Sequence, residues 1–241
     1  MRLFIIISVF SSCLNADINY ALKIPQTENS TVKRQKLFEA IALTVNTNIG
    51  KQLKPYINEL MQQGKIQLSD LQKGHYGESG EGCVVKSGKY FYEGYFILLN
   101  EKLSTAELAS ALVHEISHYQ MIKKMIDAGY TQPVKVSTFE ISAFATQYEF
   151  IKELEQLKRV NHQSMFTDEN KIISNIIHSA YKLRTNWSDV SYDAFLKQLI
   201  DYGYPYTELN RTISQRTEKQ CVGLVKSNSL LNKLTKPHTI P

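Results

Sequence analysis

The stretch from Ser104 to Asp127 constrains the fold most, because it predicts a helix that is apolar on more than one side. The sequence Ser-Thr-Ala-Glu at 104–107 has the spacing of a capping box, which starts a helix, and Gly129 follows where the helix would end. Apolar side chains extend well beyond a single stripe: Leu108, Ala109, Ala111, Leu112, Val113, Ile116 and Ile122. Such a helix is buried on several sides. The rest of the chain therefore has to pack around it.

The composition fits a folded protein with a single core. Hydrophobic residues make up 43% of the 241 residues and charged residues 21%, which is ordinary for globular proteins. The 28 lysines and arginines exceed the 23 acidic residues only slightly, and they are scattered along the chain. Nucleic-acid binders usually concentrate their basic residues on one face. We therefore expect no nucleic-acid partner.

The spacing of apolar residues predicts an α+β domain that is mostly helical. A helical pattern covers 31–63, with a break or kink expected at Gly50 and Pro55, and β-like segments follow at 83–85, 90–92 and 95–99. We expect the glycine-rich stretch 74–88 to be a flexible loop. Further helices are predicted at 137–160, 167–183, 191–202 and 207–220. No linker divides the chain, so residues 17–241 form one domain with a small sheet leading into the Ser104 helix.

The first 16 residues are typical of a signal peptide. Arg2 supplies the positive charge, residues 3–10 are apolar apart from Ser8, and Ala16 is a small residue at a cleavage position. A second possibility is a lipoprotein-type cleavage before Cys13, which would leave a lipid anchor on that cysteine. Both predict a protein that is secreted or placed in the periplasm or cell envelope.

Two further cysteines, Cys83 and Cys221, remain in the exported chain. Exported proteins commonly oxidise such a pair, so a disulfide between them is one interpretation. The other is that both stay unpaired and buried.

The candidate site is the sequence His-Glu-Ile-Ser-His at 114–118, within the Ser104 helix. Residues four apart lie one turn along the same helical face, so His114 and His118 can reach one metal ion. Imidazole nitrogens suit Zn²⁺. Glu115 lies about 100° around the helix, where it can take a proton from a water on the metal without being a ligand. The pattern predicts a zinc site with Glu115 as the catalytic base.

A catalytic zinc needs a third protein ligand. Glu140 is the best candidate, because it opens the helix after Pro133 and a turn would return it to the histidines. The alternatives are Glu149, Glu153 and Asp127. Asp127 lies about 19 Å from His114 along one helix, which is too far.

The histidine pair on one helix, followed by Glu-Ile-Ser-Ala at 140–143 on the next, resembles the gluzincins, the thermolysin-like zincin metallopeptidases. The resemblance covers residues 90–150. It implies a zincin-like fold, Glu140 as the third zinc ligand, and Ala143 as the small residue packed against the first helix. It also implies that the strand 94–100 is an edge strand that pairs with an extended substrate.

Together these features predict an exported zinc-dependent peptidase acting on peptides or proteins. The alternative is a non-catalytic envelope or secreted interaction protein with a structural metal. A hydrogen-bond donor for the transition state is also required, and Tyr130, Tyr148 and His178 are candidates by residue type alone.

Overall fold

The computed structural model describes residues 28–71, 75–86, 89–129, 132, 134–160 and 171–213. The predicted signal peptide with Cys13 and Ala16 lies outside these residues, as do Tyr130, Cys221 and the side chain of Cys83. Within the described ranges, no helix combines the length and the apolar character that crossing a bilayer requires. The chain is α+β and mostly helical, as predicted.

Two helices, α1 (Glu28–Val45) and α2 (Asn48–Gln62), replace the single kinked helix expected over 31–63. The predicted position of the break is wrong: the chain turns at 46–47, where the Thr47 hydroxyl caps α2 by accepting from Gly50 N at 2.9 Å. Gly50 is required at this turn, since a Cβ there would lie 1.8 Å from the Thr44 carbonyl oxygen. Pro55 sits exposed inside α2. The carbonyl that it leaves unbonded can therefore face water.

A three-stranded sheet, ordered β1-β3-β2, packs against these helices. β3 (Lys89–Asn100) is the central strand, parallel to β1 (Ile66–Ser69) and antiparallel to β2 (Gly77–Lys86). Two predictions are wrong here. The glycine-rich stretch contains an ordered strand, and residues 94–100 lie in the central strand. The edge strand nearest the site is β2.

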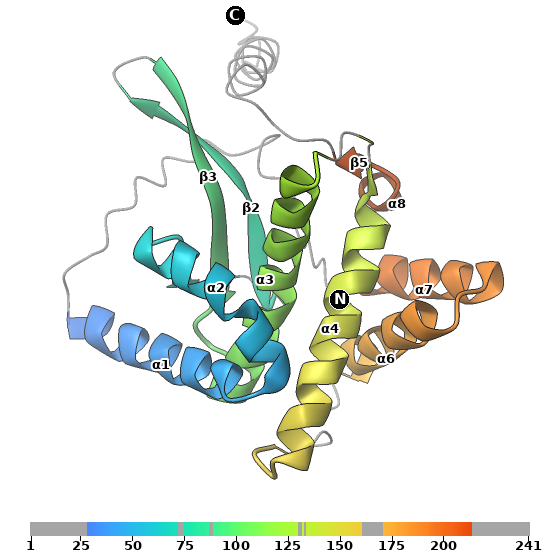
Figure 1. Ribbon diagram of the computed structural model, residues 1–241, viewed down its shortest axis with the longest axis horizontal. Coiled ribbons are helices and arrows are strands. Elements are labelled where there is room, and N and C mark those ends of the chain that lie inside the picture. The colour runs from blue at the N-terminus through green and yellow to red at the C-terminus, as the bar shows by residue number, and fades with distance from the viewer. Residues whose placement is uncertain are drawn as a thin grey trace, which may run out of the picture.

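The helix α3 (Thr105–Asp127) is the centre of the fold, as its sequence predicts. Its capping box is formed: the Ser104 hydroxyl accepts from Glu107 N, and the Glu107 carboxylate accepts from Ser104 N. Every residue from Leu108 to Tyr119 is buried. Figure 1 shows why, since the sheet with α1 and α2 lies on one side of α3 and α4 (Val136–Gln156) lies on the other.

The C-terminal part packs outside α4. Its helices are α6 (Lys171–Thr185), α7 (Asp189–Tyr202) and α8 (Tyr206–Leu209). The helix expected over 207–220 is wrong within the described residues, because α8 ends at Leu209 and β5 (Thr212–Ile213) follows. β5 pairs antiparallel with β4 (Val134–Lys135), and Val136 N donates to the Arg211 carbonyl at 2.9 Å. The start of α4 is therefore fixed by a segment from the end of the described chain.

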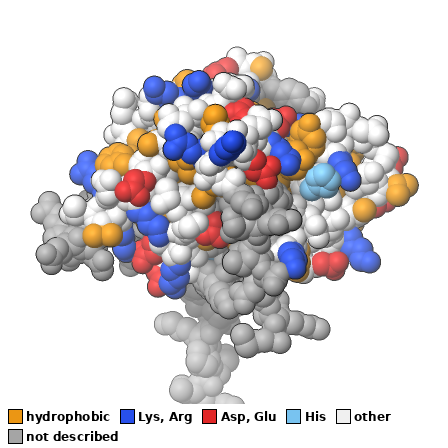
Figure 2. All heavy atoms as spheres, turned by 90° about the horizontal axis from the view of Figure 1, so that it is seen from below, with side chains coloured by type: hydrophobic (Ala, Val, Ile, Leu, Met, Phe, Trp, Pro, Cys, Tyr) orange, Lys and Arg blue, Asp and Glu red, His pale blue; other side chains and the backbone are white. Residues whose placement is uncertain are grey.

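The surface carries charges of both signs. Figure 2 shows one face, on which lysine and arginine side chains are interspersed with acidic ones. Charged side chains of the described residues form surface ion pairs, such as Lys152 with Glu155 at 2.9 Å. Exposed pairs of this kind contribute little to stability, so the fold depends on the apolar core around α3.

Candidate metal centre

The helix α3 presents His114 and His118 from the same face, one turn apart. Their Nε2 atoms lie 3.1 Å from each other, and their ring planes meet at 82°. Apolar rings pack behind both imidazoles: Phe144 lies 4.3 Å from the His114 ring centre, and Phe139 lies 6.4 Å from that of His118. The two Nε2 atoms therefore converge on one point while the rings are held by the core.

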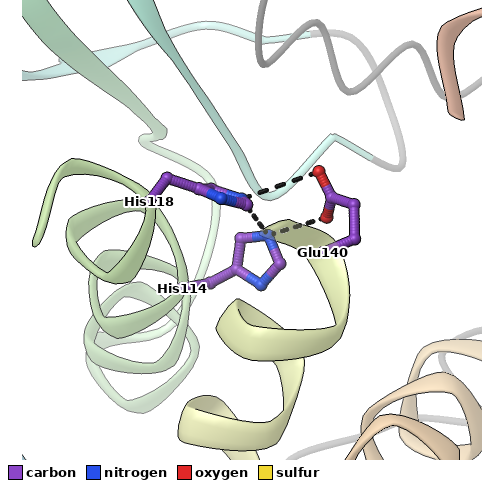
Figure 3. Close-up of side chains that lie close together, drawn as sticks. All are labelled: His114, His118 and Glu140. Carbon is purple, nitrogen blue, oxygen red and sulfur yellow. Dashed lines mark hydrogen bonds and ion pairs between the residues drawn. The ribbon is translucent and has the colours of Figure 1, made fainter. Parts of the chain in front are cut away.

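Glu140 reaches the same point from α4, as the sequence analysis expects. Its Oε2 lies 3.4 Å from His114 Nε2 and its Oε1 lies 3.6 Å from His118 Nε2. Figure 3 shows the three side chains pointing toward one another from the two helices. These three residues form a buried group that could hold a metal ion.

The polar atoms of this group support that assignment. Glu140 Oε1 is buried and accepts no hydrogen bond from any described residue, and His118 is fully buried. Burying a carboxylate beside two imidazoles is costly unless the charge is compensated. A bound cation would provide that compensation.

Burial and their mutual contacts shift the pKa values of all three side chains. Burial lowers the pKa of His118 to about 3, so this imidazole is neutral and free to donate its lone pair. Burial also acts to lower the pKa of His114, but the hydrogen bond with Glu140 and the charges of Glu115 and Glu140 together outweigh it and raise the pKa. Burial favours the protonated form of Glu140, yet its contacts with His118, His114 and Tyr204 outweigh this and lower the pKa. Glu140 therefore remains an anionic donor.

Glu115 lies beside this group without belonging to it. It is only 2% exposed, and its Oε2 accepts a hydrogen bond from the Ser79 hydroxyl of β2. Burial raises its pKa to about 7, against the opposing effects of the His114 charge and the Ser79 hydrogen bond. A carboxyl group with this pKa can both accept and release a proton near neutral pH.

Two further side chains support the donors. The Tyr204 hydroxyl donates to Glu140 Oε2 at 3.1 Å, from the turn between α7 and α8. Gln147, about two helix turns beyond Glu140, donates to the Ser110 hydroxyl at 2.8 Å and contributes to the raised pKa of His114. Polar partners behind metal ligands fix their orientation and affinity.

The other candidate ligands have different roles. Glu149 forms an ion pair with Arg184. Glu153 Oε2 accepts from Asn48 N at 2.5 Å and so caps the start of α2. Asp127 is exposed at the end of α3.

Of the candidate transition-state donors, Tyr148 and His178 lie together between α4 and α6, with ring centres 5.5 Å apart. Tyr148 is also about 12 Å along α4 from Glu140. Its nearest aromatic partner is Tyr181, whose ring centre is 4.3 Å away. These contacts do not support Tyr148 or His178 as the hydrogen-bond donor for the transition state.

Sequence reasoning missed Ser79 and Tyr204. The only local signal for Tyr204 is its place between Gly203 and Pro205, which predicts a tight turn. Gly203 ends α7 with φ +119°, and the chain then turns Tyr204 into the core, where it is 2% exposed.

Comparison of the chain with known proteins does not identify this site. No family model matches the chain, and neither a curated protein nor a solved structure does.

Proposed function

We propose that the chain is an exported zinc-dependent peptidase, with His114, His118 and Glu140 as the zinc ligands and Glu115 as the catalytic base. The separation of the donor atoms supports zinc. Bonds of 2.0–2.1 Å to tetrahedral donors place those donors about 3.3–3.4 Å apart. In the structure the two Nε2 atoms are 3.1 Å apart, and each lies 3.4 or 3.6 Å from a different oxygen of Glu140, all close to that value. Two nitrogen donors and one carboxylate are also a common catalytic zinc set.

The observation that carries the proposal is the place of Glu115. It follows His114 in the helix and is buried, yet its carboxylate bonds to Ser79 rather than joining the three donors. A structural metal site has no need for a further buried carboxylate beside it. A hydrolytic site does, because a base must take the proton from the attacking water.

Zinc bound by the three donors would polarise the scissile carbonyl and make a water more acidic. Glu115 accepts the proton from the attacking water and later donates it to the leaving amine. In the metal-free site, burial raises the pKa of Glu115 to about 7, a range in which a carboxyl group can exchange a proton. Glu140 and the two imidazoles hold their positions throughout, fixed by Tyr204 and by the rings of Phe139 and Phe144.

The substrate would be an extended peptide segment paired with the edge of β2. This edge contains Gly77 and Ser79, which border Glu115. Addition of a strand at a sheet edge is a general mode of peptide recognition. Residues 94–100, which were expected to pair with the substrate, lie in the central strand. We therefore assign the pairing with substrate to β2 instead.

The experiment is the Glu115→Gln variant, prepared beside the wild type. We expect zinc stoichiometry to be unchanged and cleavage of a degenerate peptide library to be lost. Glu149→Gln, a surface change on α4, is the matched control and should retain both. Full cleavage by the Glu115→Gln variant would reject the role of Glu115.

The competing function is a non-catalytic interaction protein with a structural metal. The burial of the donors favours it, since the side chains of His118 and Glu140 are 0% exposed. Coordination by X-ray absorption spectroscopy separates the two functions. Three protein ligands and a water support the peptidase, whereas a fourth protein ligand supports the structural role.

A further inference from the structure

The edge strand β2 shapes the surroundings of Glu115 through two alternate residues, Gly77 and Ser79. Alternate residues of a strand face the same side, and both face α3 here. A Cβ at position 77 would lie 3.0 Å from Glu115 Oε1 and 3.1 Å from its Cγ. The glycine thus leaves room for the carboxylate, while Ser79 donates a hydrogen bond to its other oxygen, Oε2.

Tyr95 of β3 lies behind Ser79. Ser79 pairs directly with Ile97 in the sheet, so Tyr95 is its diagonal neighbour on the same face. The Tyr95 hydroxyl donates to Ser79 Oγ at 2.7 Å. A serine hydroxyl has one proton to donate, so accepting from Tyr95 leaves that proton directed at Glu115. Hydrogen bonds arranged in a chain polarise and strengthen one another.

The position of Tyr95 is fixed by aromatic packing. Its ring centre lies 5.0 Å from that of Tyr119 in α3, and Tyr119 meets Tyr56 of α2 edge to face at 6.2 Å. Tyr95 is 5% exposed and Ser79 is 1% exposed. The chain of hydroxyls is therefore shielded from water, which would otherwise compete for the same hydrogen bonds.

We propose that Ser79, backed by Tyr95, is a positioning residue that holds the Glu115 carboxylate by Oε2 and leaves Oε1 free for proton transfer. This inference rests on the proposed peptidase function for its consequence in catalysis. The hydrogen bond from Ser79 to Glu115 does not itself depend on that function. The proposal also assigns a role to Gly77 and Ser79, which lie in the part of β2 that was expected to be a flexible loop.

The first test measures catalysis in zinc-loaded protein. Ser79→Ala should lower kcat by about tenfold to a hundredfold, the usual effect of losing a polar partner behind a reacting group. KM and zinc content should stay unchanged, which a general structural defect would not produce. Tyr95→Phe should cause a smaller loss in the same direction. Tyr192→Phe is the matched control and should leave kcat unchanged, because its hydroxyl pairs with Ser137 at 2.8 Å instead.

The second test needs neither metal nor activity. Unfolding of the zinc-free protein by urea is measured for Ser79→Ala, for Glu115→Ala and for the double variant. We expect the double variant to shift the midpoint by less than the two single shifts combined, because both remove the same contact. The pair Ser79→Ala with Tyr192→Phe should be additive.

Additive shifts for Ser79 and Glu115 would overturn the proposal, and so would an unchanged kcat for Ser79→Ala in an active enzyme. A wild-type chain that cleaves no peptide would instead reject the proposed function. In that case the double-mutant cycle, measured by urea unfolding, still tests whether Ser79 and Glu115 interact.

Discussion

Tyr204 donates a hydrogen bond of 3.1 Å to Glu140 Oε2, across 64 positions of the chain. Burial raises the pKa of Tyr204 well above its usual value, and the charge of Glu140 adds to this effect. Its proton is therefore retained at any physiological pH. Glu140, the carboxylate of the candidate metal site, thus has a hydrogen-bond donor that stays protonated.

Replacing Tyr204 by phenylalanine should weaken metal binding. The variant keeps the ring in the core and removes only the hydroxyl, so Glu140 loses its orienting partner. We expect zinc affinity to fall by about tenfold to a hundredfold, measured by competition with a chromophoric chelator. The Tyr192→Phe protein should bind zinc like the wild type, and equal affinities for the two variants would contradict this role of Tyr204.

Glu140→Ala should remove most of the retained metal. The change deletes a donor and leaves two histidines, which is too few for tight zinc binding. Zinc measured after dialysis against a chelator should be close to zero. Glu149→Ala, which breaks only the surface pair with Arg184, should keep its zinc. Equal zinc retention in the Glu140 variant and the wild type would reject Glu140 as a ligand.

Glu153→Ala should affect stability without affecting the metal. Its carboxylate caps α2 through Asn48 N and Ile49 N, and loss of a helix cap costs about 1 kcal/mol. Urea unfolding should report this loss, while zinc affinity stays at the wild-type value. Weaker zinc binding by this variant would contradict the prediction and would indicate that Glu153 is a zinc ligand.

The zinc-free protein should show a pH-dependent effect of Glu115→Gln. Between pH 4.5 and about 7 the folded wild type keeps a proton on Glu115, while the unfolded chain releases it. Folding stability of the wild type therefore falls through this window relative to the Gln variant, by roughly 3 kcal/mol in total. Urea unfolding at pH 4.5 and pH 8 measures the difference. A difference that does not grow with pH would contradict the raised pKa.

The sequence was sufficient for the helix α3 and for its two histidines, because capping and i, i+4 spacing are local. Glu140 could be inferred as well, since a short turn between two helices returns the second beside the first. The break between α1 and α2 was misplaced because Gly50 and Pro55 are tolerated within α2. The turn is capped by Thr47 and brings Gly50 close to the Thr44 carbonyl, and the spacing of apolar residues shows neither contact.

The sequence predicts a strand at 83–85, in the second half of β2, but its glycines obscured the first half. Gly77, Gly80 and Gly82 interrupt the alternation of apolar and polar side chains that identifies a strand. The roles of Ser79 and Tyr204 could not be inferred from the sequence either. Ser79 contacts Glu115 across 36 positions of the chain, and Tyr204 contacts Glu140 across 64. Such contacts depend on sheet register and helix packing rather than on local preference.

The pairing of β4 with β5 has a consequence for the order of events during synthesis. The three residues of the candidate metal site have all been translated by residue 140, whereas Tyr204 and the Thr212–Ile213 strand emerge about 70 residues later. A nascent chain halted before that point would carry the donors without the clamp on Glu140. An ion bound by these three residues would therefore gain the support of Tyr204 only after residues 204–213 have been synthesised.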